Sequence, residues 1–228
     1  MEIHPIAYFR SPLTSKFGLP RQSGVANDLT GRVVLEPDYR RAEAVRGLDR
    51  FDYVWLIWEF SANKATTAAE HLTVRPPRLG GNERIGVFAS RSPFRPNRLG
   101  LSCVRLRHID MEGPEAPALI VEGADLMDLT PIYDIKPYVA YADSRPQARS
   151  GFVDDHAWQR LKVSIPEQMA EMFTAEELRA LREVLAEDPR PPFHHDDSRV
   201  YGMPFARRDV RFRVGPDGVL RVVEVNTL

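Results

Sequence analysis

The chain has 228 residues, 43% of them hydrophobic, and a formal net charge of −1, so it can bury a full core in one or two domains. The near-neutral charge excludes a strong overall attraction to nucleic acid, and a polyanionic partner would have to meet a local basic patch. The single cysteine, Cys103, excludes an internal disulfide framework, and the absence of an apolar signal core or of a long uncharged apolar run predicts neither secretion nor a membrane span.

The first part of the chain is predicted to consist of short strands joined by loops rich in proline and glycine. Apolar alternation and β-branched or aromatic runs place strands at residues 3–8, 32–35, 51–60, 87–89, 101–109, 118–123 and 132–135. The nearly unbroken apolar run at 51–60 predicts a central strand covered on both faces. Asp38 is expected to cap a short helix whose Ala42, Val45 and Leu48 share one face. This arrangement predicts a mostly β fold built on a closed or rolled, mainly antiparallel sheet.

The composition changes at residues 141–155, where proline, serine and glycine indicate a linker. Beyond it, Thr174 and Glu177 form a capping box that opens a helix, and Asp188-Pro189 ends that helix. Alternation around a turn at residues 215–218 predicts a hairpin over residues 210–225. We therefore expect two domains, residues 1–145 and a small α+β C-terminal domain at residues 146–228.

A stiff basic loop lies within residues 86–102. Two prolines fix the backbone around Arg91 and Arg95, and guanidinium groups held on such a loop can bind a carboxylate or phosphate bidentately. Residues 75–107 contain eight arginines and one acid, Glu83. A surface loop with solvated arginines is the alternative interpretation.

Two other stretches are candidates for a site. Residues 11–30 form a long connection, which is typical of functional or disordered loops. Residues 125–138 crowd acids, a lysine and tyrosines between apolar positions, and alternation places Asp134 and Lys136 on one face. The alternative there is a simple edge-strand ion pair worth about 0–1 kcal/mol. The adjacent histidines at 194–195 are expected to be exposed to solvent, so no metal site is predicted.

Several of these motifs together resemble one family. They are residues 16–22 (KFGLPRQ), 45–48 (VRGL), 73–82 (TVRPPRLGGN), 86–102 and 134–138 (DIKPY), with a further likeness at residues 187–191. The chain resembles the TsaA-like (YaeB) family of S-adenosylmethionine-dependent tRNA methyltransferases, which act on N6-threonylcarbamoyladenosine beside the anticodon. The resemblance implies a β-barrel catalytic domain that works as a homodimer with the cofactor near the subunit interface. The single cysteine, for its part, fits a reducing cytoplasm, where we expect the protein. The absence of a G-x-G-x-x-G motif agrees with a fold other than the dinucleotide-binding one.

The resemblance also implies which residues bind the cofactor. They are Pro20, Arg21, Gln22, Ser61, Arg91, Leu101, Met127, Asp128, Leu129 and Thr130. The chain departs from the family pattern at two of these positions. Ser61-Ala62 stands where the family often has His-Gln, and Leu129 replaces a glycine, which matters if that position needs a positive φ.

For catalysis, the modified N6 needs a group that accepts its proton. We expect Asp134 or Asp128 in that role, and Lys136 or Arg95 to orient the threonyl carboxylate, so the expected catalytic residues are Arg95, Asp134 and Lys136. The anticodon stem-loop of tRNA would contact the arginines of residues 75–107, extended by Arg207, Arg208, Arg211 and Arg213. A non-catalytic RNA-binding barrel and a small-molecule methyltransferase are the alternative functions.

Overall fold

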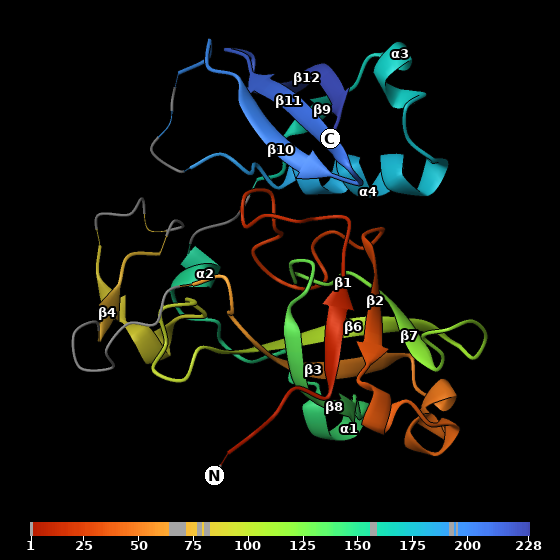
Figure 1. Cartoon of the computed structure of the whole chain (residues 1–228). Helices are drawn as coiled ribbons and strands as arrows, with labels where there is room; N and C mark the ends of the chain where they lie inside the picture. Colours follow the sequence, from red (N-terminus) through yellow and green to blue (C-terminus); the bar gives the residue numbers. More distant parts are fainter. Residues whose placement is uncertain are drawn as a thin grey trace.

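The computed structural model describes residues 2–63, 72–76, 79, 83–155, 159–191, 194 and 196–228. Six antiparallel strands close a barrel in the order β1-β2-β7-β6-β3-β8. Their bounds are β1 Ala7–Arg10, β2 Thr30–Leu35, β3 Tyr53–Glu59, β6 Leu99–Asp110, β7 Ala118–Glu122 and β8 Pro131–Pro137. The structure thus confirms the mostly β, closed-barrel prediction, with a small α+β region after it (Figure 1).

The barrel core follows from the alternation of each strand. In β3, Val54, Leu56 and Trp58 point inward and are buried, whereas Trp55 and Ile57 point outward and are half-buried. The expectation that this strand is covered on both faces is therefore wrong for the single chain. Because β3 is apolar on both faces, it also presents apolar side chains on the outside of the barrel, and the chain itself covers these only in part.

Three connections leave the barrel at the same end, and two of them are long. They are residues 11–29 between β1 and β2, residues 60–98 between β3 and β6, and residues 123–130 between β7 and β8. The register explains this: Arg10 pairs with Arg32, Thr30 with Glu122, and Glu59 with Leu99. The residues of the implied cofactor site are carried mainly by these connections.

The connection between β3 and β6 differs from its prediction. It contains the short strands β4 (Thr73–Val74) and β5 (Ile85–Gly86), which pair with each other. Residues 87–89, predicted as a strand, form the 3-10 helix η5 (Val87–Ala89) instead, because Phe88 is exposed and only Val87 is buried. Part of the 73–82 motif, including Arg78, lies outside the described residues, as does His195.

The connection between β2 and β3, at the opposite end of the barrel, consists largely of short helical turns. The predicted helix over residues 42–48 is replaced by three 3-10 helices, η1 (Pro37–Tyr39), η2 (Ala42–Val45) and η3 (Leu48–Arg50). Among the three expected apolar residues only Val45 is buried, and Gly47 adopts φ +82°, which interrupts a continuous helix.

The C-terminal domain is a four-stranded sheet with helices against it. The strands are β9 (Lys162–Ser164), β10 (Tyr201–Phe205), β11 (Arg208–Val214) and β12 (Val219–Thr227), in the order β10-β11-β12-β9. Helix α4 (Ala175–Ala186) starts at the predicted capping box of Thr174 and Glu177, and α3 (Glu167–Ala170) precedes it. The predicted linker contains two single-turn helices, α1 (Ala140–Asp143) and α2 (Phe152–Asp155).

The first long connection joins the two parts of the molecule. From β1 it rises towards the C-terminal sheet (Figure 1), and Leu13, Ala26 and Leu29 are buried in the core of that sheet rather than in the barrel. Among the described residues, no helix combines the length and apolarity needed to cross a membrane.

Candidate active site

The arm, which we define as residues 16–22, meets the basic loop directly. Arg91 Nη1 donates a hydrogen bond to Gln22 Oε1 at 2.5 Å. Lys16 Nζ donates to the Ala62 carbonyl at 2.9 Å and to Asn63 Oδ1 at 3.0 Å. The structure therefore brings the arm, the residues next to Ser61 and Arg91 together at the open end of the barrel.

A carboxyl group that the sequence analysis did not select lies beneath this contact. Trp58 Nε1 donates to Ser102 Oγ at 2.9 Å, and Ser102 Oγ donates to Asp125 Oδ1 at 2.5 Å. The positive charge of Arg91 also attracts the Asp125 carboxyl. Burial of the carboxyl nevertheless raises the pKa of Asp125.

Asp125 thus lies between the inner wall of the barrel, which it contacts through Ser102, and Arg91 of the basic loop. One sequence feature could have identified Asp125. Acids are crowded between apolar positions in residues 125–138, so some of these acids must point inward.

The connection between β7 and β8 is tied to the start of the arm's own loop. The Ser11 amide donates to Asp128 Oδ1 at 3.0 Å, and the Leu129 amide donates to the Phe9 carbonyl at 2.8 Å. Thr130 Oγ1 donates to the Met127 carbonyl at 2.7 Å and closes the turn. Residues 127–130 therefore lie in a fixed position beside the end of β1.

Other candidate residues lie away from this cluster. Asp134 and Lys136 form a half-exposed ion pair at 3.5 Å on β8, where they pair with the outward-facing Ile57 and Trp55 of β3. Leu101, 58% exposed, lies opposite Ile57 on β6. These three residues share the outer wall formed by β8, β3 and β6.

Arg95 is half-buried and braces its own loop, since its Nη1 donates to the Ser90 carbonyl at 2.8 Å. Pro20 is buried and Arg21 is exposed on the arm. Ser61 is exposed, and within the described part of the chain its hydroxyl makes no hydrogen bond.

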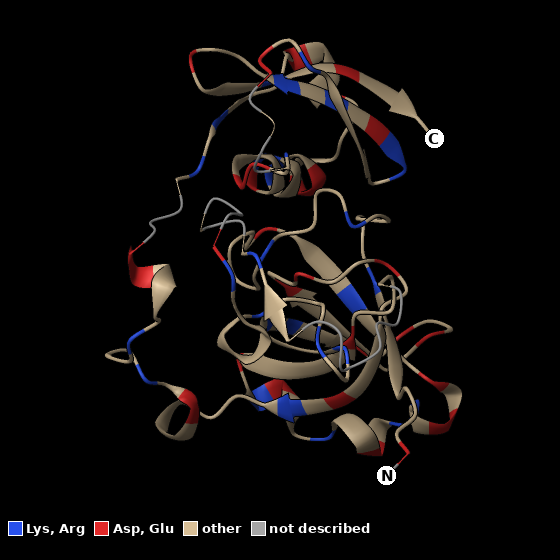
Figure 2. Cartoon of the chain, turned by 90° about the vertical axis from the view of Figure 1, so that its left-hand side faces the viewer, with Lys and Arg blue, Asp and Glu red and all other residues tan. Residues whose placement is uncertain are grey.

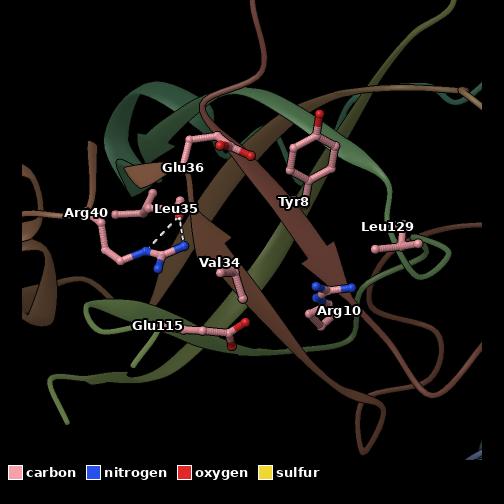
Figure 3. Close-up of a pocket in the computed structure, with 8 residues that line it drawn as sticks. All are labelled: Tyr8, Arg10, Val34, Leu35, Glu36, Arg40, Glu115 and Leu129. Carbon is pink, nitrogen blue, oxygen red and sulfur yellow. Dashed lines mark hydrogen bonds between the residues drawn. The ribbon is translucent and has the colours of Figure 1, made fainter. Parts of the chain in front are cut away.

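A groove of about 340 Å³ runs along the outside of β1 and β2 and reaches the β7–β8 connection at Leu129 (Figure 3). Arg40 is fixed at its far end, because its Nε and Nη2 donate to the Leu35 carbonyl. Its lining residues are Tyr8, Arg10, Val34, Leu35, Glu36, Arg40, Glu115 and Leu129. The groove therefore gives the connection between β7 and β8 a solvent-accessible side at Leu129.

The basic patch is smaller in the structure than in the sequence. Arg98 pairs with Glu59 at 2.6 Å, Arg107 with Glu176 at 2.7 Å, and Arg105 with Glu122 at 3.3 Å. Figure 2 shows basic and acidic residues interspersed over both parts of the molecule. In the C-terminal domain Arg208 pairs with Glu177. Arg211 pairs with Asp209 and Glu224.

The chain matches the model of the tRNA-methyltransferase O N-terminal domain over residues 8–144 and that of the TrmO C-terminal domain over residues 158–228. This chain belongs to the TrmO family. It is 36% identical to the tRNA (adenine(37)-N6)-methyltransferase of Escherichia coli, over 95% of this chain and 94% of that protein. It is 37% identical to a putative S-adenosylmethionine-dependent methyltransferase of Pseudomonas aeruginosa, over 98% of this chain and 96% of that protein.

The fold agrees with this assignment. The crystal structure of TrmO from Pseudomonas aeruginosa superposes with a TM-score of 0.78 at 31% identity, covering 99% of this chain and 97% of that one. TrmO membership confirms the family resemblance, the S-adenosylmethionine-dependent tRNA methyltransferase activity and the cofactor. The individual residue assignments remain predictions.

One departure from the TrmO-family pattern has a structural cost. Leu129 adopts φ +63°, the left-handed region in which a Cβ atom is unfavourable. Its side chain is 55% exposed, so little apolar burial offsets that cost. The position therefore does require the conformation that a glycine adopts without strain.

Leu129→Gly is expected to raise the free energy of unfolding by about 0.5–1 kcal/mol, because relief of the left-handed strain exceeds the added freedom of the unfolded chain. Leu129→Ala is the control, since it shortens the side chain but keeps the strain. Chemical denaturation of the three proteins measures the difference. Equal stability of the Gly and Ala variants would contradict the assigned strain.

Proposed function

We propose that this chain transfers a methyl group from S-adenosylmethionine to N6 of N6-threonylcarbamoyladenosine next to the anticodon of tRNA (t6A to m6t6A). The observation that supports this most is the meeting of the arm, the basic loop and residues 123–130 at one end of the barrel. In this proposal residues 1–145 form the catalytic domain and residues 146–228 the C-terminal domain, and the protein acts in the cytoplasm.

The side chains at this end of the barrel fit the proposed cofactor. Arg91 provides a guanidinium for a carboxylate, Gln22 an amide, and Leu129 an exposed apolar surface for an aromatic ring. When bound, S-adenosylmethionine supplies a methyl group already activated by its sulfonium. We propose that the remaining implied residues complete the site: Pro20, Arg21, Ser61, Leu101, Met127, Asp128 and Thr130.

The protein's own groups must then align the acceptor, exclude water and remove a proton. Asp128 already accepts the Ser11 amide through one carboxylate oxygen, and the described residues place no hydrogen-bond donor on the other. Asp134 is the alternative base, with its partner Lys136 or with Arg95 binding the threonyl carboxylate. Both Asp134 and Lys136 lie on the outer wall, so they reach a site most directly across a subunit interface.

We therefore propose a homodimer that uses the outer wall of β8, β3 and β6. Leu101 and Tyr53 are 58% and 43% exposed there, and Trp55 and Ile57 lie between them, half-buried. Large apolar side chains exposed together on one face are typical of a protein interface. A second copy on this wall brings Leu101, Asp134 and Lys136 close to the partner subunit's barrel end.

Leu101→Arg tests the interface. Burying an arginine without a partner in an apolar contact is expected to weaken dimerisation at least tenfold and cofactor binding with it. Sedimentation velocity measures the oligomeric state, and calorimetry measures the affinity for the cofactor. The control is Val223→Arg, which changes an exposed valine of the C-terminal sheet in the same way. If both variants remain dimeric, the interface lies elsewhere.

For the anticodon stem-loop, we propose contacts from the arginines of residues 75–107 that have no carboxylate partner in the described part of the chain, Arg75, Arg84 and Arg95. Arg207 and Arg213 extend this surface in the C-terminal domain. Such contacts make tRNA affinity fall as salt rises.

Mass spectrometry of tRNA nucleosides tests the function. Methylated N6-threonylcarbamoyladenosine is expected in cells that contain the protein and should disappear when its gene is deleted. An unchanged nucleoside profile contradicts the proposal. Purified protein supplies the second measurement: equal methylation of tRNA that lacks the threonylcarbamoyl group refutes the proposed acceptor but not the methyltransferase activity.

A further inference from the structure

The arm is built on the C-terminal domain rather than on the barrel. Leu13 and Leu29, which flank the arm, are buried to 0% and 2% exposure in the core of the C-terminal sheet. Phe17 and Leu19, within the arm, are partly buried against the same core. The apolar side of residues 13–29 is therefore completed by residues from the far end of the sequence.

Aromatic contacts hold the centre of the arm. The Phe17 ring stacks on the rings of Tyr201 and Phe212, with both centroid distances at 6.3 Å and both interplanar angles at 14°. Next to it, Gly18 adopts φ +94° directly over Met203, where a Cβ atom would lie 2.0 Å from the Met203 sulfur. The backbone of the arm thus lies closely against β10 and β11.

Polar contacts hold the two flanks. The Ala206 amide donates to the Pro12 carbonyl at 2.9 Å, before the arm. After it, the Asp28 amide donates to Glu183 Oε2 of α4 at 2.6 Å. The whole loop is tied to the C-terminal domain by these bonds and by the buried core.

The barrel side of the arm is different in chemistry. There the contacts are polar: Lys16 with Ala62 and Asn63, and Gln22 with Arg91. Because one side of the arm packs against the C-terminal core, the polar side is held in one conformation. Binding of a ligand therefore does not have to order the loop first.

We propose that the C-terminal domain positions the arm for cofactor binding, with Phe212, Tyr201 and Met203 as positioning residues for the methyl-transfer site. This inference rests on the proposed assignment of Pro20, Arg21 and Gln22 to the cofactor. The positioning residues touch neither the cofactor nor the acceptor and act through Phe17 and Gly18.

The test compares Phe212→Leu with Phe173→Leu in the full chain. Both remove a ring from the same buried core, but the Phe173 ring contacts Phe205 and Arg208 rather than the arm. Phe212→Leu is expected to raise the Kd and KM for S-adenosylmethionine about tenfold with kcat within twofold, because a disordered arm must be ordered on binding. Hydrogen exchange of residues 16–22 should become faster. Phe173→Leu should lower the melting temperature with the Kd within twofold.

Glu183→Ala is the second variant, used if Phe212→Leu does not fold, and it removes the bond to the Asp28 amide. It is expected to raise the Kd two- to fivefold. Unchanged Kd and unchanged exchange in the arm variants, or an equal loss in Phe173→Leu, overturn the proposal. A wild-type protein that binds the cofactor but does not methylate tRNA would refute the proposed function and leave the positioning of the arm standing.

Discussion

Replacing Arg91 with alanine is expected to raise the Kd for S-adenosylmethionine by about 10- to 100-fold, as measured by calorimetry. Arg91 is the residue that joins the arm to the basic loop through Gln22, and it also attracts the Asp125 carboxyl. Loss of a hydrogen bond to a charged group costs about 1.5–3 kcal/mol, which corresponds to this range of affinity. Arg91→Lys keeps the charge without the planar fork, so an intermediate affinity is expected.

Arg95→Ala is the matched comparison on the same loop. Its Nη1 is bound to the Ser90 carbonyl, and its other donors remain available for an acceptor. We expect its cofactor Kd to change by twofold or less while kcat/KM for tRNA falls about tenfold. Equal loss of cofactor affinity in the two variants would reject the division of roles between the two arginines.

Replacing Asp125 with asparagine is expected to make the protein more stable at neutral pH. Burial raises the pKa of Asp125, so the native state binds its proton more tightly than the unfolded state does. Stability is then lost as pH rises from the ordinary carboxyl pKa through the raised one. Thermal unfolding between pH 4 and pH 8 should show a gain in melting temperature that is largest at neutral pH and vanishes near pH 4.

The same substitution is expected to reduce activity. Without the negative charge, Arg91 loses its electrostatic partner, and kcat/KM should fall about tenfold. Ser102→Ala is the control, because it leaves the charge and instead deprives the buried Trp58 Nε1 of its acceptor, at a cost of about 1–3 kcal/mol in stability. An Asp125→Asn protein less stable than wild type at neutral pH would contradict the assigned burial cost.

Much of the fold could be predicted from local pattern. The strands near residues 32–35, 101–109 and 118–123 were found because alternation reports the inner and outer faces of a barrel wall. The capping box at Thr174 was found because both of its partners lie within four residues. The three 3-10 helices and η5 were missed, since a few apolar residues near glycine or proline are compatible with several short structures.

The site was harder to predict, because its contacts join distant segments. Gln22 and Arg91 lie on different connections, and their contact depends on the tertiary arrangement of the chain, which no local pattern specifies. Asp125 was overlooked in favour of Asp128 and Asp134, since sequence spacing alone does not tell which acid points inward. The left-handed conformation of Leu129 could not be predicted either, because leucine rarely adopts a positive φ.

The anchoring of residues 13–29 in the C-terminal core also sets an order of events during synthesis. All six barrel strands precede residue 138 in the sequence and are synthesised before β10 and β11, which begin at Tyr201 and Arg208. The barrel strands are therefore available for pairing before residues 13–29 have the C-terminal core against which they pack. A chain that ends before residue 201 would lack β10 and β11, and with them the Tyr201 and Phe212 rings on which Phe17 stacks.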